Sequence, residues 1–134
     1  MCGNKNHNGR GSVCINTFLY DHTVSGGSQE LTIHGEISII PISRQADTSM
    51  SKAVASAFEA IRNVKGIKAT LTPLGTQFEA SSLDEVAAAI KVAHAAAKQQ
   101  GAARVISSIR IDERLDKAQS LEDKVRSVEQ KLKK

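Results

Sequence analysis

The sequence predicts an α+β fold in which four strands form one sheet and two helices cover one of its faces. Three observations support this prediction. Alternating apolar and polar residues mark short strands, apolar residues spaced by three and four mark helices, and glycines or prolines separate these segments. Between Gly35 and Asp116 the order is strand, helix, strand, strand, helix, strand, and another helix ends the chain. Helices on one face leave the other face bare, so a ligand or a partner is expected to cover it.

The first strand is expected over residues 33–42, where Ile37 and Ile39 alternate with other residues and a proline then ends the pairing. The first helix follows a polar loop, with Thr48 or Ser49 as its N-cap, and Gly66 stops it. Its spacing predicts a buried stripe made of Val54, Ala57, Phe58 and Ile61.

Two further strands are expected at residues 67–74 and 75–80, joined by a hairpin turn around Pro73 and Gly75. A capping box at Ser82 and Glu85 then opens the second helix, which Gly101 terminates. The residues expected to face inward from this helix are Val86, Ala89, Ile90 and Ala93.

The fourth strand is expected over residues 104–112 and has two different faces. One face carries Val105, Ser107, Ile109 and Ile111, and the other carries Ile106, Ser108, Arg110 and Asp112. A last helix is capped by Ser120 with Asp123, and its apolar stripe is Leu121, Val125, Val128 and Leu132. The whole order is the ferredoxin-like βαββαβ topology with an additional C-terminal helix. That topology hosts many unrelated activities, so it does not by itself indicate a function.

The chain divides into an N-terminal extension, residues 1–32, and one folded domain, residues 33–134. Five of the nine glycines lie in the extension, and a Gly-Gly-Ser joint at residues 26–28 precedes the first strand. Residues 13–20 are apolar enough to add an edge strand, but a disordered extension is the favoured interpretation.

Charge and hydropathy indicate a soluble, cytoplasmic protein. The net charge of +4 is spread over segments rich in both signs and does not form one basic block. No apolar run reaches the roughly 20 residues needed to cross a bilayer, and the N-terminus lacks the pattern of a secretory signal. Cys2, Cys14 and His7 lack the spacing of a metal site, so no metal is expected and the thiols are interpreted as incidental.

Several separated motifs carry a resemblance to a known family. They are Ile39-Ile-Pro-Ile42 with Thr48-Ser-Met-Ser51, Leu74-Gly-Thr76 with Glu79, Ala93-His94 with Arg104-Val105, and Ile109-Arg-Ile-Asp-Glu-Arg-Leu-Asp116 with Asp123-Lys-Val125. In these motifs residues 35–134 resemble the family of small thiamine-binding proteins. The resemblance implies a non-catalytic protein that binds thiamine or its pyrimidine fragment and associates through its sheets into homodimers or homotetramers. One departure is Ser43-Arg44, where the family usually has a Gly-Thr type turn.

The bare sheet face offers the chemistry that such a ligand needs. Thiamine has a cationic thiazolium ring and an aminopyrimidine that donates and accepts hydrogen bonds, so its site requires carboxylates, hydroxyls and an apolar wall. In this topology the fourth strand lies beside the first, which puts Glu36 and Ser38 near Ser108 and Arg110. Including the other strands and the first helix, the candidate ligand-binding residues are Glu36, Ser38, Thr48, Ser49, Thr76, Glu79, Ser108 and Arg110.

Structural interpretations compete with these roles. Glu36 and Arg110 would also suit a cross-strand ion pair buried by a dimer, and Thr48 and Ser49 are most simply helix caps. Arg114 and Asp116 are interpreted as a pair that fixes the turn after the fourth strand, and His94 as a packed or solvent-facing helix residue.

Three other functions are weaker. Acylphosphatases share this topology and use an arginine after the first strand, where Arg44 lies, but their glycine-rich anion loop is missing and no nucleophile has a visible activating partner. RNA-binding domains of this topology need aromatic residues on the sheet, and aromatic residues make up only 3% of this chain. A structural or regulatory oligomer without a ligand is the remaining alternative. The sequence thus favours a binding protein with no catalytic residues, no cofactor and no nucleic-acid partner.

Overall fold

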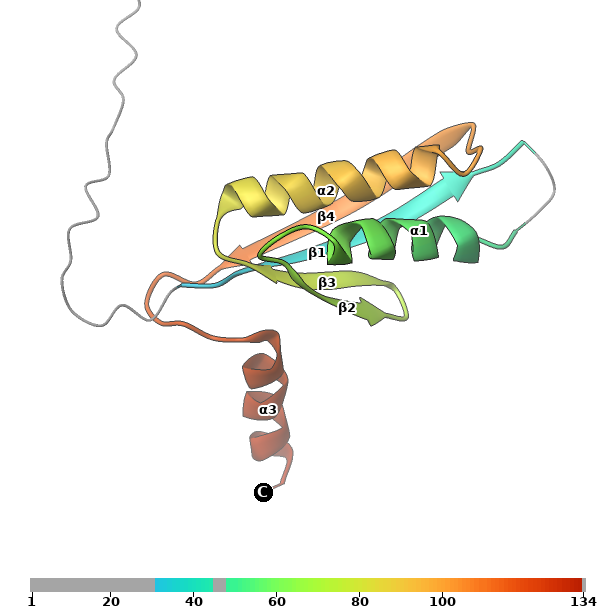
Figure 1. Cartoon of the computed structure of the whole chain (residues 1–134). Coiled ribbons are helices and arrows are strands. Elements are labelled where there is room, and N and C mark those ends of the chain that lie inside the picture. Colours follow the sequence, from blue (N-terminus) through green and yellow to red (C-terminus); the bar gives the residue numbers. More distant parts are fainter. Residues whose placement is uncertain (1–30, 45–47, 134) are drawn as a thin grey trace, which may run out of the picture.

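The computed structural model describes residues 31–44 and 48–133 of the chain. They form one antiparallel sheet with strand order β2-β3-β1-β4 and three helices (Figure 1). The elements are β1 Ile33–Ile42, α1 Ser51–Arg62, β2 Lys68–Thr72, β3 Gly75–Ala80, α2 Leu83–Lys98, β4 Arg104–Glu113 and α3 Leu121–Leu132. This order confirms the predicted ferredoxin-like α+β fold with an additional helix. The edge strand considered at residues 13–20 lies outside the described residues.

Figure 1 shows α1 and α2 together on one side of the sheet, whereas α3 extends from the other side. We call the side under α1 and α2 the helix face and the other side the open face. Ile37 of β1 lies opposite Thr76 of β3 and Ile109 of β4, and these residues point to the helix face. Glu36 lies opposite Gln77 and Arg110, and these residues point to the open face. Opposite residues in an antiparallel ladder share a face, so this register assigns every strand residue to one side.

The hydrophobic core lies between the helix face and the two helices. Its largest fully buried side chains are Phe78, Ile37, Ile61 and Val86. Gly35 makes room for Phe78, because a Cβ atom on Gly35 would lie 2.2 Å from Cζ of the ring. A glycine in β1 therefore leaves space for the aromatic ring of Phe78 on the neighbouring strand β3.

The start of α2 agrees with the sequence, but both ends of α1 differ, and α1 ends at Arg62, before the Gly66 that was expected to stop it. Ser82 caps α2, since its hydroxyl accepts a hydrogen bond from the backbone N–H of Glu85. In α1, however, Met50 occupies the N-cap position and makes no side-chain cap. The prediction that Thr48 or Ser49 caps this helix is therefore wrong: the helix begins one residue later, at Ser51, and the Ser49 hydroxyl lies 3.1 Å from that of Ser51.

The buried stripe of α1 is also rotated from the predicted one. Ala53, Ala57 and Ile61 are buried, whereas Val54 and Phe58 are only partly covered. Small residues at positions 53 and 57 allow α1 to approach α2, whose buried residues are also mostly alanine. The ring of Phe58 instead lies at the margin of the core, with the guanidinium of Arg62 5.9 Å from its centroid.

Helix α3 is well capped but poorly packed. Ser120 and Asp123 form the predicted capping box, in which each side chain bonds the backbone N–H of the other residue. None of the residues described in α3 is buried, and Val125, Val128 and Leu132 of its apolar stripe are more than half exposed. Packing among the described residues therefore does not explain the stripe.

Candidate functional site

The residues on the open face of the sheet are exposed or partly covered except at one position. Glu36 and Ser38 are partly covered, and Ile40 is exposed, but His34 on the same face of β1 is only 4% exposed. His34 lies between Glu79 of β3 and Asp112 of β4, the residues opposite it in the ladder. The first turn of α3 lies over the same end of the sheet, since the backbone N–H of Leu121 donates to Oε1 of Glu79 at 2.6 Å. The fold thus encloses one histidine on a face that is otherwise open.

A cavity of about 200 Å³ lies at this end of the open face. The sheet supplies its floor, and the start of α3 supplies one wall. Its lining residues are His34, Gly35, Glu36, Gln77, Arg110, Asp112, Leu121 and Lys124. We call this the α3 cavity.

Two side chains contact the carboxylate of Glu36 in the α3 cavity. Nε2 of Gln77 donates a hydrogen bond to its Oε2 at 3.0 Å, and a guanidinium nitrogen of Arg110 lies 3.8 Å from its Oε1. The predicted neighbourhood of Glu36, Ser38, Ser108 and Arg110 is confirmed, since Glu36 lies opposite Arg110 and Ser38 opposite Ser108. The ion pair and the cavity, which the sequence offered as competing interpretations, occur together. Because the Arg110 side chain is 78% exposed, solvent weakens this pair, and Arg110 is free to take another anionic partner.

His34 is the unusual member of the α3 cavity. Within the described part of the chain, neither of its ring nitrogens has a hydrogen-bond partner, although both are buried. A buried polar group without a partner costs roughly 1 to 3 kcal/mol. The two carboxylates opposite His34 are already engaged, Glu79 with Leu121 and Asp112 with Lys124. His34 thus lines the α3 cavity with two ring nitrogens that lack hydrogen-bond partners among the described residues.

Polar contacts hold α3 against the sheet. Nζ of Lys124 bonds Asp112, and this contact lowers the pKa of the Asp112 carboxyl. Nζ of Lys68 lies 2.7 Å from Oε1 of Glu122, and the hydrogen bond raises the pKa of Lys68 and lowers that of Glu122. The wall of the α3 cavity is thus joined to β2 and β4 by exposed charges and to β3 by a backbone N–H.

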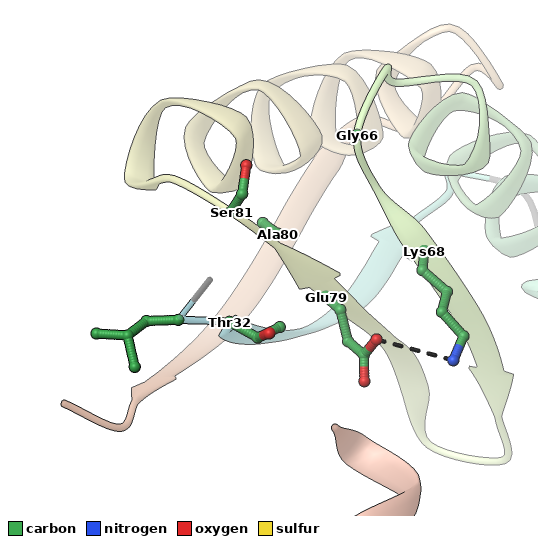
Figure 2. A pocket seen from close by; sticks show the side chains of 7 residues that line it. Thr32, Gly66, Lys68, Glu79, Ala80 and Ser81 are labelled. Carbon is green, nitrogen blue, oxygen red and sulfur yellow. Dashed lines mark ion pairs between the residues drawn. The ribbon is translucent and has the colours of Figure 1, made fainter. Parts of the chain in front are cut away.

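A second cavity, of about 240 Å³, lies beside the start of β2 and the end of β3 (Figure 2). Figure 2 shows Lys68 and Glu79 directed toward one another across it, with 3.8 Å between Nζ and Oε2. Lys68 also pairs with Glu122, and Glu79 accepts the N–H of Leu121. Its charged residues already have partners within the chain, so this cavity is a weaker candidate than the α3 cavity.

A third cavity, of about 540 Å³, lies at the opposite end of the sheet beside the start of α1. Thr48, Ser49 and Lys52 line it together with Gln100. Thr48 and Ser49, predicted with the other site residues, therefore lie beside a different cavity from Glu36 and Arg110.

The remaining predicted residues are divided between the two faces. Ser38 and Ser108 lie opposite each other on the open face, and Glu79 lies at the wall shared with α3. Thr76 was expected on the open face, but it is 5% exposed and lies opposite Ile37 on the helix face. The turn has only two residues, Pro73 and Leu74, between Thr72 and Gly75, and this pairing turns Gln77 rather than Thr76 to the open face.

The candidate residues of the sequence analysis did not include four polar residues of the α3 cavity, His34, Gln77, Asp112 and Lys124. Period-two spacing was a usable signal for His34, which is two residues before Glu36. Two other interpretations agree with the structure. Arg114 pairs with Asp116 at 2.5 Å and lowers the pKa of that carboxyl to about 2, and Nδ1 of His94 lies 2.7 Å from the hydroxyl of Ser107.

In the portion that the structure describes, no group of three or more His, Cys, Asp or Glu side chains is placed to hold a metal ion. Cys2, His7 and Cys14 lie outside the described residues. Among the described helices, none is both long and apolar enough to cross a membrane.

Comparison with known proteins shows which family has this arrangement. The model of a family described as "Thiamine-binding protein" matches residues 35–129, which include β2, β3, β4 and most of β1 and α3. Ile33 and His34 at the start of β1 precede the matched residues. The chain belongs to this thiamine-binding protein family. A UPF0045 protein of Methanothermobacter thermautotrophicus is 39% identical over 100 residues, covering 75% of this chain and 99% of that protein. The UPF0045 protein YqgV of Bacillus subtilis is 37% identical over 100 residues, covering 72% and 94%.

Among solved structures, a hypothetical protein of Methanocaldococcus jannaschii is similar to this thiamine-binding family member with a TM-score of 0.64. The two sequences are 36% identical, and the match covers 73% of this chain and 96% of that one. That solved structure shares the ferredoxin-like fold of this chain.

Proposed function

We propose that this protein binds thiamine or its pyrimidine fragment, without catalysis, with the aminopyrimidine ring in the α3 cavity. The observation that carries the proposal is His34, a buried imidazole with two unpartnered nitrogens that faces a cavity. Buried polar groups are normally hydrogen-bonded, and a ligand that supplies the missing partners would remove the cost of this exception. Membership of the thiamine-binding family supports the choice of ligand.

The donors and acceptors of the α3 cavity suit an aminopyrimidine. The ring presents an exocyclic amino group, which donates, and ring nitrogens, which accept. Glu36 supplies a carboxylate acceptor, Gln77 an amide, and His34 one donor and one acceptor. Gln77 and Arg110 hold the Glu36 carboxylate from two sides, so it would be ready to bind before the ligand arrives.

The size of the α3 cavity limits what it can hold. Sites for drug-sized ligands usually measure roughly 300 to 1,000 Å³, whereas this cavity measures about 200 Å³. It suits a single substituted ring. The thiazolium ring of intact thiamine would therefore lie outside, along the open face near Ser38 and Ser108, with Glu36 as the nearest carboxylate to balance its charge.

The proposed functional form is a cytoplasmic homo-oligomer that acts as a carrier, buffer or sensor. Exposed apolar residues on the open side of the molecule support this assembly. Ile40 and Ile106 lie opposite each other on the open face and are 43% and 38% exposed, and the stripe of α3 is also exposed. A second copy against this face would cover these residues and close the ligand site from solvent.

Isothermal titration calorimetry tests the ligand. Purified protein is titrated in parallel with thiamine, thiamine diphosphate and hydroxymethylpyrimidine. We expect saturable binding of thiamine and of hydroxymethylpyrimidine, since both carry the ring that the cavity fits. Glu36→Ala should weaken both roughly ten- to a hundredfold, because hydrogen bonds to a charged group contribute roughly 1.5 to 3 kcal/mol.

Ser49→Ala is the matched control, because Ser49 lies beside the cavity at the opposite end of the sheet. The control should bind like the parent protein. If Ser49→Ala weakened binding and Glu36→Ala did not, the ligand would occupy the wrong cavity for this proposal. Absence of heat with all three compounds, while the protein stays folded, would contradict thiamine binding and leave a structural or regulatory oligomer.

A further inference from the structure

Two cationic side chains line the α3 cavity on the side of β4. Arg110 belongs to β4 itself, and Lys124 reaches the cavity from α3. Nζ of Lys124 bonds Asp112, which follows Arg110 by two positions on the same face of the strand, so Arg110 and Asp112 lie roughly 7 Å apart. The side chains of Arg110 and Lys124 are 78% and 30% exposed. Both cations therefore lie at the rim of the cavity, in contact with solvent.

Both cations keep donors that their present partners do not use. A guanidinium has five N–H donors and an ammonium has three. Within residues 31–44 and 48–133, Arg110 pairs with Glu36 at 3.8 Å, which is longer than a hydrogen bond, and Lys124 bonds Asp112. An anion at the rim could therefore bind both cations while these two pairs remain in place.

The shape of the proposed ligand decides which of its groups would meet Arg110. In hydroxymethylpyrimidine, the carbon that carries the amino group lies between a ring nitrogen and the carbon that carries the hydroxymethyl group. The amino group would donate to Glu36. On the β3 side of Glu36, the amide of Gln77 uses one N–H for that carboxylate and has a second for the ring nitrogen. The hydroxymethyl group then points to the β4 side, where Arg110 lies opposite Glu36.

The charge of the group attached to that methylene carbon is therefore decisive. A phosphate monoester would carry roughly −1.5 to −2 charges at neutral pH and would bind a guanidinium in a bidentate, charge-assisted geometry. In thiamine the same carbon carries the thiazolium ring, whose permanent positive charge would lie beside that of Arg110. Arg110 also competes for the charge of Glu36, the nearest carboxylate to the thiazolium. An anionic group is thus favoured at this position, and a cationic group is not.

We propose that the α3 cavity selects the phosphate monoester of hydroxymethylpyrimidine over both the free alcohol and thiamine, with Arg110 and Lys124 binding the phosphate. The ring would fill the cavity of about 200 Å³, and the phosphate would lie at the rim, where it keeps part of its water. This inference rests on the proposed function, from which it takes the position of the ring, and it adds the chemical class of the ligand. Arg110 would determine specificity, because among the groups of the ligand it would contact only the substituent.

Isothermal titration calorimetry on the full chain tests this selection with hydroxymethylpyrimidine, its phosphate monoester and thiamine. We expect the monoester to bind roughly ten- to a hundredfold more tightly than the alcohol, since it adds charge-assisted hydrogen bonds. Raising the salt concentration should reduce this advantage, because the rim is exposed to solvent. In protein saturated with the alcohol, the monoester should displace the alcohol, as expected of two ligands that share one site.

Arg110→Gln removes the positive charge and keeps a polar side chain. We expect the advantage of the monoester over the alcohol to fall roughly tenfold, and thiamine to bind more tightly than it binds to the parent protein. Arg104→Gln is the matched control, because it removes the same charge from the same face of the same strand, roughly 20 Å away. The control should keep both the advantage of the monoester and the affinity for thiamine. Comparing the two pyrimidines within each variant cancels any change in affinity for the ring itself.

Equal affinities for the alcohol and the monoester in the parent protein would overturn the selection and leave binding of the pyrimidine in place. The same conclusion follows if Arg110→Gln keeps the advantage of the monoester, or if Arg104→Gln loses it to the same extent. Thiamine that binds no more tightly to Arg110→Gln than to the parent would overturn the role of Arg110 against the cation. Absence of heat with all three ligands would instead contradict the proposed function itself, and this inference with it.

Discussion

The two faces of the sheet are built from the same strands but serve different purposes. On the helix face, Ile37, Ile39 and Phe78 are buried beneath α1 and α2. On the open face, charged and hydroxyl residues alternate with them, and only His34 is buried. The helix face has what a stable core requires, whereas the open face keeps a buried polar group without a partner, at a cost to stability. The buried core thus lies on one face of the sheet, and the residues of the proposed site lie on the other.

Phe78→Ala should have the largest effect, because it removes the largest fully buried side chain from the helix face. We expect the free energy of unfolding to fall by about 3 to 5 kcal/mol. Ser38→Ala, on the open face, should change it by no more than about 0.5 kcal/mol. Chemical denaturation of both variants measures the difference. Similar losses in the two variants would remove the distinction between a stabilising and a functional face.

His34→Leu sharpens the comparison because stability and binding should move in different directions. Leucine fills much of the same space without polar atoms, so the free energy of unfolding should stay the same or rise by about 1 kcal/mol. Binding of hydroxymethylpyrimidine should be lost, since the donor and the acceptor of the imidazole are gone. Denaturation and calorimetry on the same preparation measure both. A strongly destabilised variant would show that His34 serves the fold instead.

The smallest effect on stability is expected from lowering the pH, which should weaken the contacts of α3 with the sheet and leave the packing of the helix face intact. Hydrogen bonds from Lys124 to Asp112, from Lys68 to Glu122 and from the backbone of Ser120 to Asp123 all lower the pKa of the carboxyl. A carboxyl with a lowered pKa in the folded state stabilises that state above its ordinary pKa and loses this contribution as the pH falls through the lowered value. The ordinary values are 4.5 for Glu122 and 3.8 for the two aspartates.

We therefore expect the docking of α3 to be complete at neutral pH and to weaken progressively below about pH 4.5. The amide resonance of Leu121, whose N–H bonds Glu79, should report this change before global unfolding. In the variant Asp112→Asn, which lacks one of the titrating carboxyls, the docking of α3 should depend less on pH than in the parent protein. An α3 that leaves the sheet on raising the pH from neutral while Lys68, whose pKa is raised from 10.5, is still protonated would have the opposite sign and would contradict the assignment of these contacts.

The sequence predicted the element order because period-two and helical spacings are strong signals in short segments. The pairing of β1 with β4 was expected from the ferredoxin-like topology to which that order corresponds. It placed Glu36 opposite Arg110 correctly for the same reason. It misplaced Thr76, because the face of a strand after a hairpin depends on the number of turn residues, and a single residue reverses it. The prediction of the α1 N-cap was also wrong, since several hydroxyl residues close together are equally good cap candidates.

The α3 cavity could not be foreseen in full because it forms between segments far apart in the chain. His34 and Lys124 meet only because α3 turns back over the open face, and no local pattern states where a terminal helix docks. The exposed contacts that fix α3 are individually weak, and their partners were not apparent from spacing. Local pattern therefore predicted the scaffold, and only the tertiary structure revealed the site.

The missing side chain of Gly35 has a consequence for how relatives of this protein can diverge. The ring of Phe78 occupies the space that a side chain at position 35 would need. A larger residue at position 35 therefore becomes tolerable only if position 78 becomes smaller, so the two positions should vary together across the family. Position 35 separates His34 from Glu36, so a change there would also shift the strand that carries both residues of the α3 cavity. Through this pair of positions, selection on the ligand would also constrain the interior of the domain.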